Sequence, residues 1–185
     1  FFRIVDIIEA LGEEKPKYLL LENVKNLYTH DSKRTYRVIR GKLEELGYHV
    51  YDDIFNTADF HLQQKRNRLY IFATLEEPQE GLLFNFTAQA ISEHFNSKLD
   101  SFSGLKSNSV LDFLDADADR KYFLSERIKP TILSDGSKGY KSHSEINQVV
   151  ARPLTATMHK MHRACQDNYY SQDFIVSKGK VNAAQ

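Results

Sequence analysis

The stretch that decides the fold is Tyr18-Leu19-Leu20-Leu21-Glu22-Asn23-Val24-Lys25-Asn26. Its apolar run stops abruptly at a carboxylate, an amide and a basic turn. A short apolar run that follows a helix is typical of a buried parallel strand. Because open α/β sheets bind ligands at the carboxyl ends of their strands, we expect Glu22 to face a crevice there. The alternative is an ordinary charged side chain in a strand-to-helix turn.

Helical patterns flank this strand on both sides. Apolar residues recur at helical spacing over residues 1–11, and Gly12 is expected to end that helix. After the strand, Asp31 is expected to cap a second helix over residues 31–46, with Gly47 at its end. The order helix, strand, helix predicts an α/β fold in which this part is a piece of a doubly wound sheet.

A polar, basic loop separates two further strands. Residues 48–57 and 69–73 have strand patterns, and His61-Leu62-Gln63-Gln64-Lys65-Arg66-Asn67-Arg68 lies between them. The two strands are expected to form an antiparallel pair at the sheet edge. Arg66 and Arg68 would project to the same side of an extended chain, where guanidinium groups suit base carbonyls, carboxylates and phosphates. A solvated face or a structural ion pair is the alternative.

The character of the chain changes after Thr74. Glu76-Glu77-Pro78-Gln79-Glu80-Gly81 is charged and punctuated by Pro and Gly, and it predicts a domain junction. We therefore divide the chain into residues 1–78 and 79–185. In the second part, Ser, Asn, Asp and Gly interrupt short apolar pieces, which indicates a small, irregular, mostly β domain.

Residues 151–163, Ala-Arg-Pro-Leu-Thr-Ala-Thr-Met-His-Lys-Met-His-Arg, interleave cations with hydroxyls and small side chains. Such side chains contact phosphates and base edges, although an ordinary polar strand and loop explains the composition equally well. If this segment does contact nucleic acid, the primary candidates are Arg152, Lys160 and Arg163, and the secondary candidates are Thr155, Thr157, His159 and His162.

Composition narrows the class of protein. The 185 residues are 41% hydrophobic, which indicates a globular chain, and no apolar run approaches the roughly 18 residues of a membrane span. The net charge is zero, yet residues 130–185 carry seven basic and four acidic side chains. A neutral total argues against strong nonspecific binding to polyanions but leaves room for a local basic face.

The single cysteine, Cys165, excludes an internal disulfide framework and fits a reducing cytoplasm. His159 and His162 lie near it, but this grouping lacks a convincing ligand spacing, so we expect no metal site. The chain opens on Phe1-Phe2-Arg3-Ile4-Val5 without Met, inside an expected helix. We therefore expect a fragment of a longer protein.

Glu22-Asn23-Val24 at a strand end, followed by Gln64-Lys65-Arg66-Asn67-Arg68-Leu69-Tyr70, resembles the DNA cytosine-5 methyltransferase family. Asn56-Thr57-Ala58-Asp59-Phe60 before the basic loop is also similar to that family. The resemblance covers residues 1 to about 75, and Arg152-Pro-Leu-Thr-Ala-Thr157 is similar to the family's target-recognition domain. It implies a Rossmann-like methyltransferase sheet, with the C-terminal half of the catalytic domain in residues 1–78 and target recognition in residues 79–185.

The resemblance also implies a chemistry. These enzymes flip cytosine out of duplex DNA, attack C6 with a cysteine thiolate and methylate C5 from S-adenosylmethionine. By resemblance, Glu22 grips N3 and the exocyclic amine, Arg68 and Arg66 hold the O2 side and the neighbouring frame, and Asn23 and Gln64 orient the pocket. The implied setting is a bacterial restriction–modification system, in the cytoplasm at the nucleoid.

The chain departs from the family in several places. The family's Gly-rich cofactor loop, its Pro-Cys nucleophile and its closing C-terminal segment have no counterpart in these 185 residues, and Gln63 stands where the family usually has Pro. S-adenosylmethionine is therefore expected to bind mainly outside this chain. Cys165 lacks the Pro-Cys context and is not expected to be the nucleophile.

Three functional readings remain open from the sequence. The first is part of a DNA cytosine-5 methyltransferase that is inactive when isolated. The second is a DNA-recognition subunit or remnant that needs a complementary chain, carrying the nucleophile and the cofactor loop, for any chemistry. The third is an unrelated α/β protein in which Glu22 and Arg68 are structural, and it predicts no salt-dependent affinity for duplex DNA.

Overall fold

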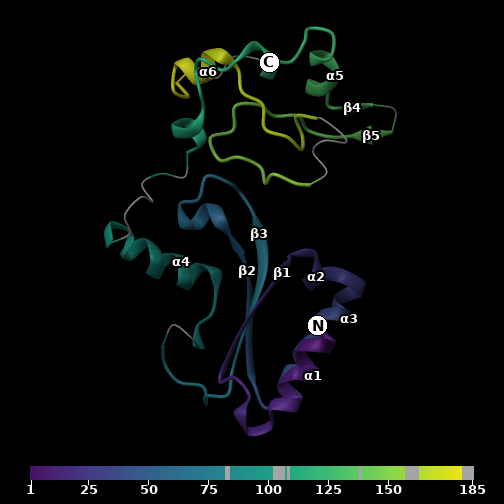
Figure 1. Cartoon of the computed structure of the whole chain (residues 1–185), viewed down its shortest axis with the longest axis vertical. Coiled ribbons are helices and arrows are strands. Elements are labelled where there is room, and N and C mark those ends of the chain that lie inside the picture. Colours follow the sequence, from purple (N-terminus) through teal and green to yellow (C-terminus); the bar gives the residue numbers. More distant parts are fainter. Residues whose placement is uncertain (82–83, 102–106, 108, 138, 157–162, 181–185) are drawn as a thin grey trace. The chain divides into compact units, whose positions relative to one another are not determined.

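The structure is a computed structural model of the chain, and it describes residues 1–81, 84–101, 107, 109–137, 139–156 and 163–180 (Figure 1). The chain divides into two compact units. The first unit comprises Phe1–Phe60 and Asn67–Ser103, and the second comprises His61–Arg66 and Gly104–Gln185. This division differs from the expected junction at residue 78, because the first unit continues beyond it and the basic loop belongs to the second unit.

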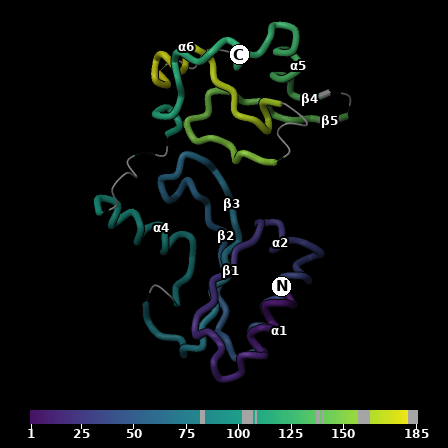
Figure 2. The backbone as a smooth tube through the Cα atoms, viewed as in Figure 1, coloured from purple at the N-terminus to yellow at the C-terminus, as the bar shows by residue number. Residues whose placement is uncertain are grey.

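A three-stranded sheet is the centre of the first unit. Its strands are β1 (Tyr18–Val24), β2 (His49–Asn56) and β3 (Asn67–Thr74), in the order β1-β3-β2. Both neighbouring pairs are antiparallel (Figure 2). The predicted antiparallel pairing of β2 with β3 is confirmed, whereas the prediction that Tyr18–Leu21 forms a parallel strand is wrong. The reason is that β3 runs between β1 and β2 in the opposite direction to both.

The apolar run of β1 is buried on one side. Leu19 and Leu21 pack against the core, while Tyr18 is 45% exposed and Leu20 is 62% exposed. Alternation of this kind is typical of a strand in an antiparallel sheet that has only one face covered along its own length. A continuous apolar run therefore did not signal burial on both faces.

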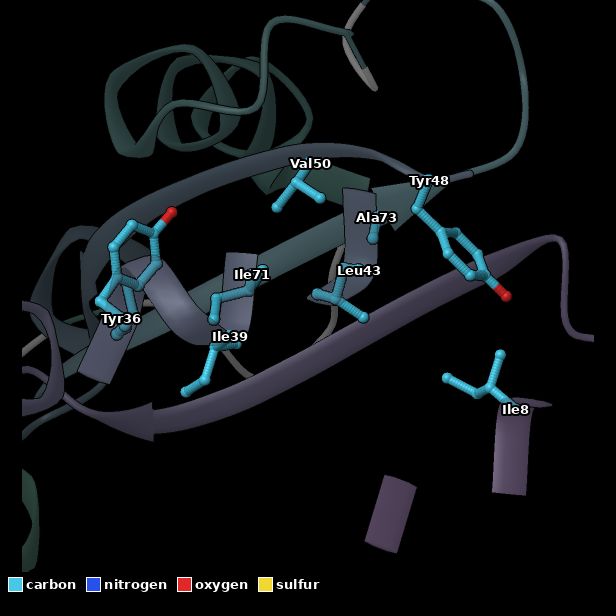
Figure 3. Close-up of a cluster of buried hydrophobic side chains, with 9 residues drawn as sticks. Ile8, Tyr36, Ile39, Leu43, Tyr48, Val50, Ile71 and Ala73 are labelled. Carbon is cyan, nitrogen blue, oxygen red and sulfur yellow. The ribbon is translucent and has the colours of Figure 1, made fainter. Parts of the chain in front are cut away.

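Helices α1 (Phe2–Leu11) and α3 (Arg34–Glu45) cover one face of the sheet, and Figure 1 shows both on the same side of the strands. Gly12 ends α1 with a φ of 54°, as its position in the sequence predicted. The core between the helices and the sheet, shown in Figure 3, is made of Ile8, Tyr36, Ile39, Leu43, Tyr48, Val50, Leu69, Ile71 and Ala73.

A polar network is built into the edge of this core. The hydroxyl of Tyr36 donates a hydrogen bond to the carboxylate of Asp52, to which Arg40 donates from 3.3 Å. Burial, followed by the hydrogen bond to Asp52, raises the pKa of Tyr36 well above the ordinary tyrosine value. The network therefore favours the neutral phenol in the folded state.

The opposite face of the sheet carries an aromatic layer and helix α4 (Ala88–Ser97). The ring of Phe55 lies 5.4 Å from Tyr70 and 5.2 Å from Phe86. Thr87 caps the helix, and the carboxylate of Asp53 in β2 accepts from the backbone N–H of Ala88 at 2.7 Å. The sequence analysis did not predict this helix, because its apolar positions are few and a junction was expected just before it.

Between β1 and α3 the chain forms α2 (Asn26–Thr29) and a 3₁₀ segment (His30–Lys33). Asp31, Ser32 and Lys33 have left-handed backbones, with φ of 47°, 51° and 68°. The prediction that Asp31 caps the following helix is wrong, because the left-handed residues move its start to Arg34 with Lys33 as the N-cap.

The described part of the second unit has little regular structure. Its helices and strands are α5 (Lys129–Leu133), α6 (Gln172–Val176), β4 (Gly136–Ser137) and β5 (Tyr140–Lys141). Strands of two residues do not make a mostly β domain, so that expectation is wrong for the part of the chain that the structure describes. Backbone-to-side-chain bonds of Ser, Asn and Asp replace strand ladders there, for example where Asn147 accepts from the N–H of Ser171 at 2.8 Å.

Single 3₁₀ turns complete the described structure in both units. They are Gly12–Glu14, Thr57–Phe60, Leu99–Ser101, Val110–Phe113 and Arg120–Tyr122. Among the described helices, none has the length and apolar character needed to cross a membrane.

Candidate functional site

One end of the sheet carries the predicted site residues Glu22, Asn23 and Arg68. The carboxyl ends of β1 and β2 and the amino end of β3 meet there, with Arg68 of β3 paired to Val24 on one side and to Phe55 on the other. Ligand chemistry in open α/β sheets is found at such strand ends. Glu22, two residues before the end of β1, is therefore held on regular backbone next to this edge.

Glu22 and Arg68 form an ion pair at this end of the sheet. The Nε of Arg68 lies 2.7 Å from the Oε1 of Glu22, and the side chains are 20% and 47% exposed. Arg68 also donates from a terminal nitrogen to the carbonyl of Asn67 at 2.9 Å. The two predicted residues thus meet at one site, with the carboxylate more accessible than the guanidinium.

Asn23 is turned toward its own backbone. Its Oδ1 accepts from the N–H of Val24 at 2.8 Å, which is a local bond at the end of β1. Side chains alternate along a strand, so Asn23 and Glu22 start from opposite faces of the sheet. The structure therefore does not place the Asn23 amide beside the ion pair.

Gln64 and Arg66 belong to the second unit rather than to β3. The segment Gln63–Lys65 pairs there with Ala151 in an isolated parallel bridge. The N–H of Lys65 donates to the carbonyl of Ala151 at 2.8 Å, and the N–H of Ala151 donates to the carbonyl of Gln63 at 2.9 Å. The basic loop and the region predicted to recognise DNA are therefore joined by main-chain hydrogen bonds.

The candidate DNA contacts are only partly within the described residues. The guanidinium of Arg152 is directed toward Glu145, with a separation of 3.2 Å. Thr155 is exposed, and Arg163 is half-buried and donates to the hydroxyl of Ser134 at 3.2 Å. The remaining candidates, which lie outside the described residues, are Thr157, His159, Lys160 and His162.

Sequence reasoning missed two residues that hold this region together. Glu145 binds the guanidinium of Arg152, and Asn168 exchanges two hydrogen bonds with the backbone of Arg152. They lie seven positions before and sixteen positions after Arg152 in irregular chain. No periodic spacing connects them, so nothing local in the sequence identifies the pairings.

A cavity of about 360 Å³ lies beside the bridge, within the second unit. The residues that line it are mostly apolar: Leu62, Gln63, Gln64, Val110, Phe113, Leu114, Ala151, Arg152, Leu154, Asn168 and Tyr170. Burial raises the pKa of Tyr170, whose hydroxyl donates to the carbonyl of Gln148 at 3.2 Å. Among the described residues, no three His, Cys, Asp or Glu side chains are grouped so as to hold a metal ion.

The sequence of this chain is similar to a known protein family and to several of its members. A family model described as C-5 cytosine-specific DNA methylase matches residues 1–184. Type II methyltransferase M.HaeII from Haemophilus aegyptius is 40% identical over 139 residues, which are 75% of this chain and 37% of that protein. Type II methyltransferase M1.ScrFI from Lactococcus lactis subsp. cremoris is 35% identical over 147 residues, covering 80% of this chain and 32% of that protein. The chain thus spans about a third of the length of these relatives.

Two solved structures share the fold. The S. pombe Dnmt2 methyltransferase matches with a TM-score of 0.60 and 16% identity, over 90% of this chain and 47% of that one. The Entamoeba histolytica methyltransferase EhMeth matches with a TM-score of 0.55 and 16% identity, over 89% and 44% of the two chains. At this identity the likeness concerns the α/β fold alone.

Proposed function

This chain belongs to the C-5 cytosine-specific DNA methylase family, and on that premise we propose that it forms part of a DNA (cytosine-5-)-methyltransferase. In this proposal the chain acts on a flipped cytosine in a specific duplex sequence, within a restriction–modification system. The observation that carries it is the meeting of Glu22 and Arg68 at the carboxyl end of β1. The Type II relatives support the restriction–modification setting.

The ion pair suits the recognition of a cytosine. We assign Glu22 to the N3 and exocyclic amine edge, where a carboxyl group can both donate and accept, and Arg68 to the O2 side. The Oε1 of Glu22 binds Arg68, and in this proposal the base contacts the exposed part of the Glu22 carboxyl group. Arg68 balances the charge of the Glu22 carboxylate before a base binds.

The covalent step needs a nucleophile from elsewhere. A thiolate that adds to C6 places negative charge on the ring. In this proposal the Glu22 carboxyl is protonated when the base is bound, gives its proton to N3 and leaves a carboxylate that stays paired with Arg68. None of the four prolines in these 185 residues precedes a cysteine, so we assign the thiolate to a Pro-Cys segment outside them. Cys165 is half-buried and is given no role in the reaction.

The family implies S-adenosylmethionine, which supplies an electrophilic methyl group when it is bound. The side chains at the described end of the sheet are already engaged, Glu22 with Arg68 and Asn23 with its own backbone. They therefore do not form a ready cradle for this cofactor. We assign none of them to it and derive no step through it.

Duplex DNA is the proposed partner of the second unit. Thr155 and Arg163 are the proposed contacts among the described residues, and Thr157, His159, Lys160 and His162 remain predictions from the sequence. Residues 79–185 carry the recognition function in this proposal, together with the loop His61–Arg66 that the second unit includes. Gln64 and Arg66 remain proposed pocket residues on that loop.

Complementation tests the proposal. The chain is mixed with a fragment that supplies the cofactor loop and the Pro-Cys nucleophile, and transfer of labelled methyl groups to duplex DNA is measured. We expect transfer from the mixture and none from either part alone. The Glu22→Gln chain should bind DNA normally and transfer far less, whereas unchanged transfer by this variant would refute the assignment.

The second candidate function is a DNA-recognition subunit without chemistry of its own. The observation that favours it is the seven-to-four excess of basic over acidic side chains in residues 130–185. It predicts a salt-dependent affinity for DNA and no methyl transfer in any mixture. Restored transfer would exclude it.

A further inference from the structure

The segment Glu145–Arg152 runs through the middle of the second unit and is bonded on both sides. On one side, the N–H of Glu145 donates to the carbonyl of Ala164 and the N–H of Asn147 donates to the carbonyl of Tyr169, at 3.3 and 2.9 Å. On the other side, the carbonyl of Val149 accepts from the N–H of Val110, and Ala151 pairs with Gln64 of the basic loop. The segment thus connects parts that are far apart in the sequence.

Arg152 is held at its backbone. Its N–H donates to the Oδ1 of Asn168 at 2.7 Å, and its carbonyl accepts from the Nδ2 of the same side chain at 3.0 Å. A side-chain amide that bonds both groups of one residue replaces the ladder that a neighbouring strand would provide. The backbone next to Ala151 is therefore fixed by Asn168.

Arg152 is also held at its guanidinium. One terminal nitrogen donates to the carbonyls of Glu145 and Asp167, at 3.2 and 3.4 Å, and the other donates to the Glu145 carboxylate at 3.2 Å. The Arg152 side chain is 19% exposed. Charge-assisted bonds to fixed acceptors restrain a side chain more strongly than neutral ones.

The loop that Ala151 holds lies beside a hollow of the second unit. Gln63, Gln64, Ala151 and Arg152 all border the cavity of about 360 Å³. Side chains that face this hollow make fewer van der Waals contacts there, so the two main-chain bonds to Ala151 contribute to the position of this loop. A side-chain bond from Gln63 to the carbonyl of Ser107, at 2.8 Å, restrains the same loop.

We propose that Arg152 is a positioning residue that fixes Ala151 and, through it, the segment Gln63–Lys65. Glu145 and Asn168 are its partners in this role. The inference rests on the proposed function in one respect, because the segment it positions carries the pocket candidate Gln64 and leads directly to Arg66. It assigns Arg152 to the interior of the second unit instead of the DNA surface.

Amide hydrogen exchange of the free 185-residue chain tests the positioning role without any activity measurement. In Arg152→Ala, the amides of Lys65 and Ala151 should exchange about tenfold faster than in the parent chain. The amide of Ala164, which bonds the carbonyl of Ile132 in the same unit, should keep its rate. The matched control is Arg127→Ala, which removes an exposed guanidinium of this unit and should leave all three amides unchanged.

Two further variants keep the test decisive. Arg152→Lys retains the charge but cannot bond three acceptors in the same planar arrangement, so it should accelerate the same two amides if Arg152→Ala does not fold. Glu145→Ala removes the carboxylate and should give a smaller acceleration, because the Glu145 carbonyl still accepts. Unchanged exchange at Lys65 and Ala151, or equal acceleration at Ala164, would overturn the proposal.

DNA binding separates this role from a phosphate contact. The slope of log affinity against log salt should be the same for Arg152→Lys, Arg152→Ala and the parent chain. A slope for Arg152→Ala lower by about one, with unchanged amide exchange, would show a phosphate contact and contradict the positioning role. If no mixture transfers methyl groups but the two amides exchange faster, the proposed function fails and the positioning role stands.

Discussion

Glu22 meets Arg68 diagonally across two antiparallel strands, because the register pairs Glu22 with Tyr70 and Arg68 with Val24. Residues two apart on one strand share a face, so both side chains start from the same side of the sheet. Diagonal neighbours of this kind are within reach of long side chains. The ion pair therefore follows directly from the pairing of β1 with β3.

Removing the acid of this pair should impair chemistry more than folding. In the complemented enzyme, Glu22→Gln is expected to slow methyl transfer by about 10²- to 10⁴-fold, since a positioned proton donor is lost. The free energy of unfolding should change by less than about 1 kcal/mol, because the pair is partly solvated. Single-turnover rates and urea unfolding measure the two effects, and a large loss of stability would assign Glu22 a structural role.

Replacing the guanidinium tests its planar geometry. Arg68→Lys keeps the charge but loses the fork that bonds Glu22 and the Asn67 carbonyl together. We expect the methyl-transfer rate to fall about tenfold, equivalent to about 1.4 kcal/mol. Arg37→Lys changes an exposed side chain of α3 and serves as the control. Equal rates for the two variants would show that charge alone matters at Arg68.

Tyr36 should make the folded state sensitive to alkaline pH. Its pKa is raised by burial and by its bond to Asp52, so its contribution to stability is complete below the ordinary tyrosine pKa of 10.0 and declines as the pH rises above it. Tyr36→Phe should cost about 1–3 kcal/mol near neutral pH, by leaving Asp52 short of a donor. Above pH 10 the free energy of unfolding of Tyr36→Phe should fall less steeply with pH than that of the parent chain.

Urea unfolding at several pH values measures both effects of Tyr36→Phe. Tyr122→Phe, which changes a side chain that is 74% exposed, is the control and should follow the parent chain throughout. Parallel pH profiles for the parent chain and Tyr36→Phe would contradict the raised pKa as a source of alkaline instability.

The helical face of the sheet should dominate the stability of the first unit. Leu43 is fully buried between α3 and the strands, so Leu43→Ala should lower the free energy of unfolding by about 2–5 kcal/mol. Val38 lies on the outer side of the same helix and is 42% exposed, so Val38→Ala should cost under about 1 kcal/mol. Similar losses at both positions would mean that α3 is not packed as described.

Elements with strong periodicity were predicted well. The expected strands at residues 48–57 and 69–73 correspond to β2 and β3, and the helix expected over residues 1–11 is α1. Local patterns suffice there because β2 and β3 are rich in β-branched and aromatic residues and α1 buries Val5 and Ile8 at helical spacing. The helix α4 was missed because its apolar positions are few, and the bond of its Ala88 N–H to Asp53 involves a residue 35 positions earlier.

Pairing direction and long-range contacts were the limits of sequence reasoning. The apolar run Tyr18–Leu21 is compatible with both a parallel and an antiparallel strand. Its pairing with β3 makes it antiparallel. Proximity of Glu22 and Arg68 was inferred through the family resemblance, whereas the bonds of Arg152 to Glu145 and Asn168 left no trace in residue spacing. Contacts made by irregular chain depend on the whole fold and not on local pattern.

The placement of His61–Arg66 in the second unit has a practical consequence for engineering target specificity. If residues 104–185 were exchanged for those of a relative, His61–Arg66 would have to pair with the relative's residue at the position of Ala151. Chimeras that also transfer residues 61–66 keep matched partners across both main-chain bonds. A graft that transfers only one continuous segment would divide the second unit, because this unit is built from two separate segments of the chain.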